Sequence, residues 1–360
     1  MTESPIDGFV AVVPAGGVGS RLWPLSRPER PKFLLDLLGT GTSLLQATLE
    51  RLAPLTGEVV VVTGAAHANA VLEQCPQLGQ ADVLAEPSPR DSMAAIALAA
   101  AVIEQRMGPR VIGSFAADHV IGDPLAFRAA VRTAVGAAQD GYVVTIGVEP
   151  TEPSTAFGYI QVGSEYSEGV ERVIAFTEKP DAQTASVMLA GGGYVWNAGM
   201  FVVRTDVLLG KLAELQPTLE QGVRRIAAAW DSPQKESVLA DVWPTLTRIA
   251  IDHAIAEPVA AQGGVAVVQG SFDWRDVGDF ASVADILQPD ADGVIRVAGS
   301  APVGVVAADG VIAIGVTKAL AVVGIEGAVI VETEDAILVT TRASAQLVKD
   351  AAKLFQKPGS

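Results

Sequence analysis

Short apolar runs alternate with helical patterns over the first half of this 360-residue chain. The apolar runs are rich in valine and lie at 9–13, 59–62, 81–85, 110–116 and 142–148. Segments of helical period separate them, at about 43–53, 67–74, 91–106 and 124–139. Strands that alternate with helices in this way form βαβ units. The pattern therefore predicts an α/β fold with a Rossmann-like, mixed and mostly parallel sheet flanked by helices.

The pattern changes twice later in the chain. Residues 157–203 are β-rich with one helix at about 181–190, helical patterns return at 205–230 and 246–257, and a strand-like run follows at 265–268. After about residue 290, short runs of Val, Ile, Ala and Gly dominate without an exact sequence repeat, and an amphipathic helix closes the chain. We therefore expect a large domain over 1–288 and a small β-rich C-terminal module over 289–360.

The composition argues against several kinds of partner and location. A formal net charge of −16 and a pI near 4.6 disfavour nucleic acid and anionic membranes. Charged residues such as Asp309 and Lys318 interrupt the long apolar runs before they could span a bilayer. Glu3 and Asp7 stand where a signal peptide would be basic and then apolar. With Cys75 as the one cysteine, an intramolecular disulfide is excluded, and we expect a soluble, cytoplasmic protein.

A glycine-rich loop follows the first apolar run. Glycines at 16, 17 and 19 leave backbone N–H groups uncovered, so that they can point at phosphate oxygens. A single anion, Glu29, stands among four cations in a chain that is otherwise acidic: Arg21, Arg27, Arg30 and Lys32. Leu22 occupies the position of the last glycine in the dinucleotide fingerprint G-x-G-x-x-G, and the P-loop pattern has no match here. The segment therefore predicts a polyphosphate site of another kind.

Residues 15–32 resemble the signature of the sugar-1-phosphate nucleotidyltransferases, G-G-x-G-x-R-L-x-P-L-[ST] followed by P-K. Within it, the sequence R-L-W-P-L-S-R resembles the mannose-1-phosphate guanylyltransferase branch of that family. The resemblance implies the GT-A-like nucleotidyltransferase fold. It also implies that this loop binds the triphosphate of the nucleotide through Ala15, Gly16, Gly17, Gly19, Ser20 and Arg21. Arg21 and Lys32 are implied as catalytic, with Lys32 near the α-phosphate and leaving group. A glycine turn with a solvated basic loop is the alternative.

Two carboxylates are candidates for a metal site. Asp118 follows an apolar strand, at the edge where the carboxyl ends of parallel strands bring ligands. It matches the family's metal-binding aspartate, and Asp276 matches the aspartate of a later D-x-G segment. Because Mg²⁺ takes one or two protein carboxylates, the resemblance implies that these two residues hold Mg²⁺ and that Asp118 also serves catalysis beside the nucleotide. The alternatives are a loop cap for Asp118 and a helix N-cap for Asp276.

Three segments in the middle of the chain resemble the family's sugar-phosphate site. The E-K-P motif implies that Glu178 accepts hydrogen bonds from sugar hydroxyls and that Lys179 meets the sugar phosphate. The W-N-A-G motif implies that Asn197 and the Gly199 backbone hold the hexose, and an asparagine in an apolar run favours a use for its amide. Gly158 is implied to let the sugar approach the main chain. A surface turn ahead of a helix is the alternative for E-K-P.

A further segment, E-P-S-P-R-D-S-M-A-A at 86–95, resembles a stretch that helps to hold the base in the guanylyltransferases. It implies nucleotide contacts from Glu86, Arg90, Asp91 and Ser92. Asp91 stands where the family commonly has asparagine. We hypothesise that its carboxylate, or a neighbouring carbonyl, accepts hydrogen bonds from guanine N1–H and N2–H₂, donors that adenine lacks at these positions. A helix N-cap at Asp91 or Ser92 is the alternative.

The resemblance implies the reaction of that branch. GTP and mannose 1-phosphate would give GDP-mannose and pyrophosphate by direct, Mg²⁺-assisted in-line attack, without a covalent intermediate on the protein. We expect a homodimer with neither nucleic acid nor membrane as partner. Two alternatives stay open. One is a uridylyl- or thymidylyltransferase acting on glucose 1-phosphate, and the other is a catalytically inactive regulatory subunit that binds nucleotide sugars.

Some members of the branch carry an additional phosphomannose isomerase domain. Roughly 70 residues follow the predicted large domain, and these are too few for an isomerase domain. We therefore expect a transferase alone, whose C-terminal module packs on the large domain or on a second subunit. The three histidines, at 67, 119 and 253, lack the spacing of a metal site.

Overall fold

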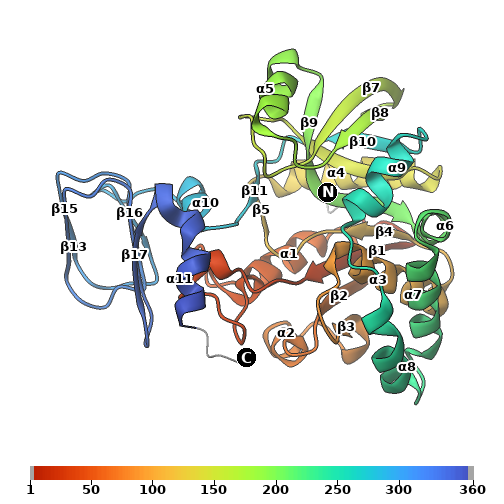
Figure 1. Ribbon diagram of the computed structural model, residues 1–360, viewed down its shortest axis with the longest axis horizontal. Helices are drawn as coiled ribbons and strands as arrows, with labels where there is room; N and C mark the ends of the chain where they lie inside the picture. Colours follow the sequence, from red (N-terminus) through yellow and green to blue (C-terminus); the bar gives the residue numbers. More distant parts are fainter. Residues whose placement is uncertain (1–3, 356–360) are drawn as a thin grey trace. The chain divides into compact units, whose positions relative to one another are not determined.

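The computed structural model describes residues 4–355 and forms two compact units, shown with their elements in Figure 1. Of the described residues, unit 1 holds 4–16, 49–117 and 121–274. Unit 2 holds 17–48, 118–120 and 275–355, so it contains most of the glycine-rich loop, Asp118 and the C-terminal module. The loop and the module are thus parts of one compact body, although about 250 residues separate them in the sequence.

A nine-stranded mixed sheet forms the centre of unit 1, in the order β3-β2-β1-β4-β9-β6-β10-β8-β7. Strands β8 and β9 run antiparallel to the other seven. This confirms the mixed, mostly parallel sheet. The strands are β1 (Phe9–Ala15), β2 (Val59–Gly64), β3 (Val83–Glu86), β4 (Val111–Ser114), β6 (Val143–Val148), β7 (Tyr159–Ser167), β8 (Val170–Thr177), β9 (Tyr194–Arg204) and β10 (Val265–Gln269). A separate pair joins β5 (His119–Ile121) to β11 (Trp274–Asp276).

The helices lie largely where the periodicity predicts them. They are α1 (Leu44–Leu52), α2 (Ala68–Gln74), α3 (Asp91–Met107), α4 (Pro124–Gln139), α5 (Ala182–Gly191), α6 (Thr205–Leu215), α7 (Pro217–Ala229), α8 (Lys235–Val242), α9 (Glu257–Ala260), α10 (Phe280–Ile286) and α11 (Val348–Leu354). Short 3-10 helices are η1 (Ser20–Leu22), η2 (Lys32–Leu34), η3 (Gln80–Asp82), η4 (Trp243–Thr245) and η6 (Arg342–Leu347).

One predicted helix, 246–257, is wrong in its first half. The regular structure there is the π-helix η5 (Asp252–Ala256), which continues into α9. The preceding backbone bonds to the start of α3 instead, because Ile251 N donates to Ser92 Oγ at 2.9 Å and Ile249 O accepts from Met93 N at 3.2 Å. A tertiary contact therefore overrides the local helical pattern.

Alternation along β1 separates the two faces of the sheet. Val10 and Val12 belong to the core that includes α3, in which every residue from Met93 to Ile103 is buried. Phe9 points the other way and meets Phe115 edge-on, with 6.5 Å between ring centroids. Phe115 in turn contacts Phe127 of α4 at 5.6 Å. The apolar stripes of the two helices thus cover opposite faces of the sheet, as the α/β pattern predicts.

Strands β12 (Val294–Val297) to β16 (Ala328–Glu332) of the C-terminal module form a coil of parallel pairs with a repeat of 17 residues, and β17 (Ile337–Thr341) adds to it antiparallel to β16. Val294 pairs with Val311, Ile312 pairs with Val329, and the offset is 17 in each case. Strands β12, β14 (Val311–Ile314), β16 and β17 form one sheet, and β13 (Val303–Val306) pairs with β15 (Leu320–Val323). The strands and the closing helix α11 confirm a β-rich module that ends in a helix. The strands thus repeat in the structure although the sequence does not repeat exactly, and the sequence analysis did not predict this structural repeat.

Strands β12, β14 and β16 of the larger sheet are buried on both faces, whereas Ile337 and Val339 of β17 are exposed. Val294, Val311 and Ala328 point into the coil. Ile312 and its neighbours on the outer face belong to a second core, built with side chains of the 17–48 segment and of α10. The module therefore packs on segments from the large domain, which confirms one of the two expected packing arrangements.

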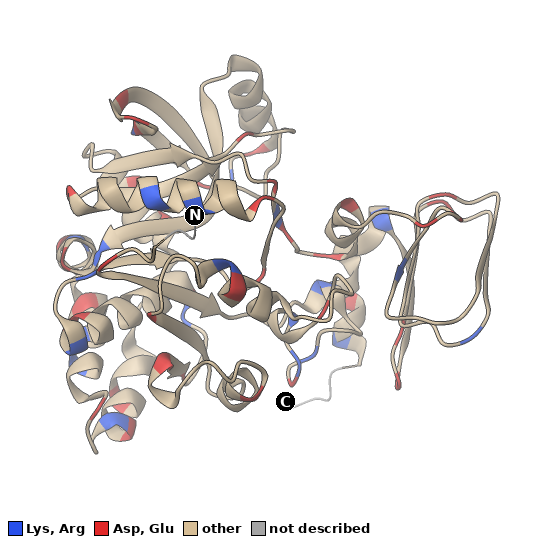
Figure 2. Ribbon diagram, turned by 180° about the vertical axis from the view of Figure 1, so that it is seen from behind, with Lys and Arg blue, Asp and Glu red and all other residues tan. Residues whose placement is uncertain are grey.

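Charge and hydropathy along the helices agree with the composition. Figure 2 shows acidic and basic residues interspersed along the ribbons of both units. Among the residues that the structure describes, we find no helix that is both long and apolar enough to cross a membrane.

The two buried faces of the module sheet lead to a stability prediction. Replacing Ile312, which is fully buried, with alanine leaves a cavity and should lower the free energy of unfolding by about 2–5 kcal/mol in urea denaturation. Val323→Ala is the matched control, because Val323 is 62% exposed and its replacement should change stability by less than about 0.5 kcal/mol. Equal, small effects of both replacements would contradict the packing described here.

Candidate active site

The glycine-rich loop begins where β1 ends. Gly17 and Gly19 have φ angles of 79° and 74°, in the left-handed region that favours glycine. A Cβ on Gly19 would lie 2.7 Å from Lys32 Cβ, so glycine lets the lysine stem pass directly beside the loop. Ser26 Oγ donates to Gly19 O at 2.5 Å, and Lys32 N donates to Val18 O at 3.2 Å. The loop is thus closed by its own downstream residues.

Lys32 brings together the two predicted metal ligands. Its Nζ lies 2.6 Å from Asp118 Oδ2 and 3.7 Å from Asp276 Oδ1, and it donates to Val277 O at 2.7 Å. Lys32 is only 8% exposed, so its charge depends on these partners. The structure confirms that the loop and the end of the Asp118 strand meet at one edge, since Ala117 N also donates to Pro14 O beside β1.

The ionisation of Asp118 suits a cation ligand. Burial by itself would raise the pKa of Asp118, but the Lys32 ammonium and its hydrogen bond, with His119 nearby, hold that pKa below its ordinary value. A carboxylate that stays charged is the hard oxygen donor that a divalent cation prefers. Among the described residues no cluster of three or more His, Cys, Asp or Glu could hold a metal.

Arg21 lies in the same unit, on η1. A Cβ on Gly278 would lie 3.3 Å from an Arg21 guanidinium nitrogen, so the glycine of the D-x-G segment leaves room for it. Arg21 and Ser20 are exposed and can meet a solute, whereas Leu22 is fully buried beneath them. In this short helix Arg21 therefore faces solvent, while the buried Leu22 fixes the helix to the core.

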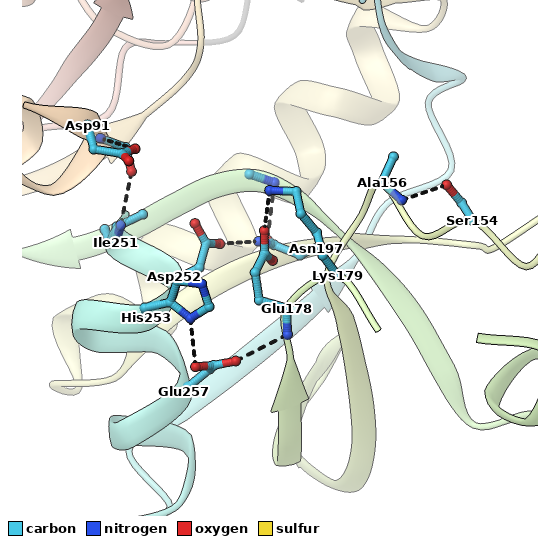
Figure 3. Close-up of polar contacts among 12 residues, drawn as sticks. Asp91, Ser154, Ala156, Glu178, Lys179, Asn197, Ile251, Asp252, His253 and Glu257 are labelled. Carbon is cyan, nitrogen blue, oxygen red and sulfur yellow. Dashed lines mark hydrogen bonds and ion pairs between the residues drawn. The ribbon is translucent and has the colours of Figure 1, made fainter. Parts of the chain in front are cut away.

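Unit 1 holds the residues predicted for the sugar phosphate (Figure 3). Asn197, on β9, is 7% exposed, and both ends of its amide make hydrogen bonds within the protein. Its Oδ1 accepts from Thr145 Oγ1 at 2.8 Å and from Gly199 N at 3.1 Å, and its Nδ2 donates to Asp252 Oδ1 at 2.8 Å. The amide is thus used within the protein, where it holds Asp252 in place, and the predicted contact of Asn197 with the hexose stays a prediction.

Glu178 and Lys179 form an ion pair at the end of β8. Lys179 Nζ lies 2.6 Å from Glu178 Oε1, and Glu178 N donates to Glu257 Oε1 at 3.2 Å. Lys179 has a φ of 47°, which is rare for a residue with a side chain and concentrates at functional sites. A Cβ on Gly158 would lie 2.5 Å from Glu178 Oε2. The absence of a side chain at Gly158 therefore lets the Glu178 carboxylate lie against the main chain, at the place where the sugar is expected to approach.

Two acidic residues of this cluster escaped the sequence analysis. Asp252 begins the π-helix η5, and π-helical turns often mark functional sites. Glu257 pairs through Oε2 with His253 Nδ1 at 2.9 Å, an i, i+4 pair that could have been found from the sequence. Burial raises the pKa of Asp252 to about 6, and the Glu178 carboxylate adds to the increase. The cluster therefore joins three carboxylates, one lysine and one amide.

The predicted base-binding segment joins β3 to α3. Arg90 is used within the protein, because its guanidinium donates to Pro244 O at 2.7 Å and to Leu246 O at 3.2 Å. Trp243 Nε1 donates to Ser88 O at 2.8 Å, which ties η4 to the same segment. Arg90 and Trp243 thus brace the backbone that leads into α3.

The start of α3 is not the N-cap considered as the alternative reading of this segment. Arg90 occupies the capping position without a side-chain cap, and Ser92 Oγ is taken by Ile251 N. Asp91 has a φ of 66°, a conformation that Asn and Asp tolerate better than most residues, and its Oδ1 accepts from Ser92 N at 2.9 Å. Glu86 lies nearby in the sequence, and burial raises its pKa to about 7.

The raised pKa of Asp252 makes stability depend on pH. Between about pH 4 and 6 the folded chain binds a proton at Asp252 that the unfolded chain does not, so this residue stabilises the fold less as pH rises through that range. Asp252→Asn should therefore gain about 1–3 kcal/mol relative to wild type on going from about pH 4.5 to about pH 8 in urea denaturation. Glu168→Gln, at an exposed position, should show no such gain, and a pH-independent effect of Asp252→Asn would contradict the assignment.

Comparison with known proteins identifies the family. The family model for nucleotidyl transferases matches residues 10–293. The chain is 36% identical over 295 residues to the xanthan biosynthesis protein XanB of Xanthomonas campestris pv. campestris, covering 80% of this chain and 61% of that protein. It is also 36% identical over 293 residues to a mannose-1-phosphate guanylyltransferase of Escherichia coli, covering 79% and 61%. The chain thus spans about three-fifths of the length of these relatives.

A solved structure extends the likeness to the whole chain. A crystal structure described as a mannose-1-phosphate geranyltransferase from Thermus thermophilus matches with a TM-score of 0.85 and 30% identity, covering 97% of this chain and 100% of that one. That coverage includes the C-terminal module as well as the sheet. Since the family model also covers well over half of the residues, the chain belongs to the nucleotidyl transferase family.

Proposed function

We propose that this chain is a mannose-1-phosphate guanylyltransferase, which transfers GMP from GTP to α-D-mannose 1-phosphate and gives GDP-mannose and pyrophosphate. One observation carries the proposal: a buried lysine holds two carboxylates, Asp118 and Asp276, beside a glycine loop that presents Arg21. That set can bind a triphosphate together with a divalent cation. The mannose and guanine specificities are supported by the names of relatives such as the Escherichia coli enzyme.

The glycine-rich loop and the carboxylates beside Lys32 would handle the triphosphate. The loop from Ala15 through Gly16 and Gly17 to Ser20 offers N–H groups to phosphate oxygens, and the exposed Arg21 adds a fixed positive charge. Lys32 would lie beside the α-phosphate and keep Asp118 ionised. Nucleotidyl transferases generally use a divalent metal ion. We assign Mg²⁺ to Asp118 and Asp276, where it would neutralise charge on the triphosphate.

The residues of unit 1 would handle the sugar phosphate. Lys179 is exposed enough to meet a phosphate, since its side chain is 61% exposed, whereas Glu178 is largely buried behind it. Glu178 and the Asn197–Asp252 pair would accept and donate hydrogen bonds to hexose hydroxyls, with Gly199 contributing its backbone. The hydrogen bonds among these groups keep them fixed before substrate arrives, which reduces the ordering needed on binding.

The chemistry needs no covalent intermediate on the protein. An oxygen of mannose 1-phosphate attacks the α-phosphorus of GTP, the new P–O bond forms, and the bond to the β-phosphate breaks as pyrophosphate leaves. The protein must bring two anions together and stabilise charge on the pentavalent phosphorus. Arg21, Lys32 and Lys179 supply positive charge for that purpose. Lys32 and Lys179 are already held by partners in the folded protein, so these two side chains need little rearrangement in the reaction.

The 86–95 segment is our candidate for guanine recognition. Asp91 is exposed at the start of α3, and its Oδ1 is engaged by Ser92 N, which leaves Oδ2 as an acceptor for guanine donors. We propose that Glu86 and Ser92 complete the nucleotide contacts and that Arg90 acts as the brace of this segment through its two carbonyl partners.

The remaining assignments concern the whole protein. We propose a transferase domain over 1–288 followed by the module over 289–360, a division close to the end of the family match at residue 293. We also propose a cytoplasmic homodimer without nucleic acid or membrane as partner. The net charge of −16 supports the last point, because it repels both kinds of polyanionic surface.

One assay tests the proposal as a whole. Purified protein with Mg²⁺ should release pyrophosphate from GTP and mannose 1-phosphate faster than from UTP or dTTP with glucose 1-phosphate. The opposite order would point to a different nucleotidyltransferase. A lack of pyrophosphate release with every pair would point to a nucleotide-sugar-binding subunit.

Removal of either charged group in the triphosphate site should abolish most of the activity. Arg21→Ala and Asp118→Ala should each lower kcat by about 100-fold or more, because each removes a group that stabilises the charged transition state. Circular dichroism should show the fold intact. Arg30→Ala, an exposed cation of the same loop, is the matched control and should stay near wild type. Activity near wild type in either of the first two variants would overturn the assignment.

Replacement of Asp91 tests base recognition separately. Asp91→Asn keeps a residue that tolerates the positive φ, so the backbone should be preserved. Loss of the carboxylate should reduce the preference for GTP over ATP, measured as the ratio of kcat/KM values, by about tenfold. An unchanged ratio would show that the Asp91 side chain does not read the base.

A further inference from the structure

The loop that carries Arg21 is built on the C-terminal module. Leu22 and Trp23 directly follow Arg21 and are 0% and 8% exposed. They belong to one core with Val348 and Ala352 of α11. These four residues lie in unit 2, and the cluster also takes in the outer face of the module sheet. The apolar half of the loop therefore has its partners at the far end of the chain.

Trp23 also stacks on Phe355, an exposed residue that directly follows α11. The rings of Trp23 and Phe355 are 5.0 Å apart at an interplanar angle of 5°. The Arg27 guanidinium lies over the Trp23 ring at 5.8 Å, and its NH2 group pairs with Asp335 at 2.7 Å. Asp335 belongs to the turn between β16 and β17 of the module. Phe355 and Asp335 thus contact the loop at two points, Trp23 and Arg27.

The module also contacts the segment that follows Asp276. Gln346, on η6, donates to Asp279, the N-cap residue of α10, and Arg342 of η6 pairs with Asp285 at the other end of that helix. The same C-terminal elements therefore touch the loop of Arg21 and the helix next to Asp276. The C-terminal elements η6 and α11 therefore contact both parts of the proposed triphosphate site, the Arg21 loop and the segment after Asp276.

We propose that the C-terminal module positions the triphosphate loop, with Phe355 and Asp335 as positioning residues that act through Trp23 and Arg27. The inference rests on the proposed function in one respect, namely that this loop binds a nucleoside triphosphate. Gly17 and Gly19 give the loop conformational freedom that must be lost when it binds. Because Leu22 and Trp23 are packed against the module, part of that freedom is lost before the nucleotide binds, and the backbone of Arg21 is held in a fixed position.

The two positions are suited to substitution. Phe355 is 67% exposed and Asp335 has a side chain that is 67% exposed, so neither replacement leaves a cavity in the core. Leu354 offers a matched control for Phe355, since it is the adjacent apolar residue and is 80% exposed. Glu334 offers the same for Asp335, as the exposed acidic neighbour in the turn.

The experiment compares the full-length variants Phe355→Ala and Asp335→Asn with Leu354→Ala and Glu334→Gln. In Phe355→Ala the KM for GTP should rise about two- to tenfold, the loss expected for one aromatic stack, and the KM for mannose 1-phosphate should stay within about twofold of wild type. Asp335→Asn should shift the KM for GTP in the same direction by a smaller factor, because the ion pair is exposed. Phe355→Tyr should restore the wild-type value, and both controls should match wild type.

Hydrogen exchange supplies a second readout that does not depend on turnover. Backbone amides of residues 17–25 should exchange at least about twofold faster in Phe355→Ala than in Leu354→Ala, without substrate present. Equal exchange together with an unchanged KM for GTP would overturn the inference while leaving the transferase assignment intact. Faster exchange in a protein that catalyses no nucleotidyl transfer would retain the positioning role and overturn the proposed function.

Discussion

The contacts of the Lys32 ammonium are the interactions on which the proposed triphosphate site depends. A lysine that is 8% exposed must find compensating charge, and here Asp118, Asp276 and the Val277 carbonyl supply it. Those partners come from distant segments of the chain, so one buried charge ties them together. Gly19 makes the arrangement possible, because any Cβ there would collide with the lysine stem. The Lys32 ammonium in turn keeps Asp118 ionised, although burial by itself would raise the pKa of that carboxyl.

The C-terminal module extends this arrangement outward. Its strands stack with a repeat of 17 residues, and a sheet built in this way has two apolar faces. One face fills the coil, and the other needs a cover, which the 17–48 segment and α10 supply. Burial of apolar area therefore joins the module to the loop that carries Arg21. The module thus shares an apolar core with the loop that we propose binds the triphosphate.

The hexose side shows a different kind of organisation, based on hydrogen bonds. Asn197 bonds to Asp252 and Lys179 bonds to Glu178, and burial with the nearby Glu178 carboxylate raises the pKa of Asp252 to about 6. Such a network is fixed before substrate binds, and its acceptors and donors match the hydroxyls of a sugar. The sequence pointed to Asn197 and Glu178 through their motifs. It offered no comparable signal for Asp252, which is a single acidic residue ahead of an irregular helix.

What the sequence determined by itself was local: the order of strands and helices, the glycine loop after the first strand, and the motifs that mark Asp118, Glu178 and Asp276. Periodicity and short spacing encode these features, because they depend on neighbours in the chain. Only the tertiary structure decided that Arg90 braces a turn, that residues 246–250 leave the helix for contacts with α3, and that the module supports the loop. Each of these depends on a contact between residues more than 100 positions apart, where the preference of one segment is outweighed by the apolar area and hydrogen bonds that another segment offers.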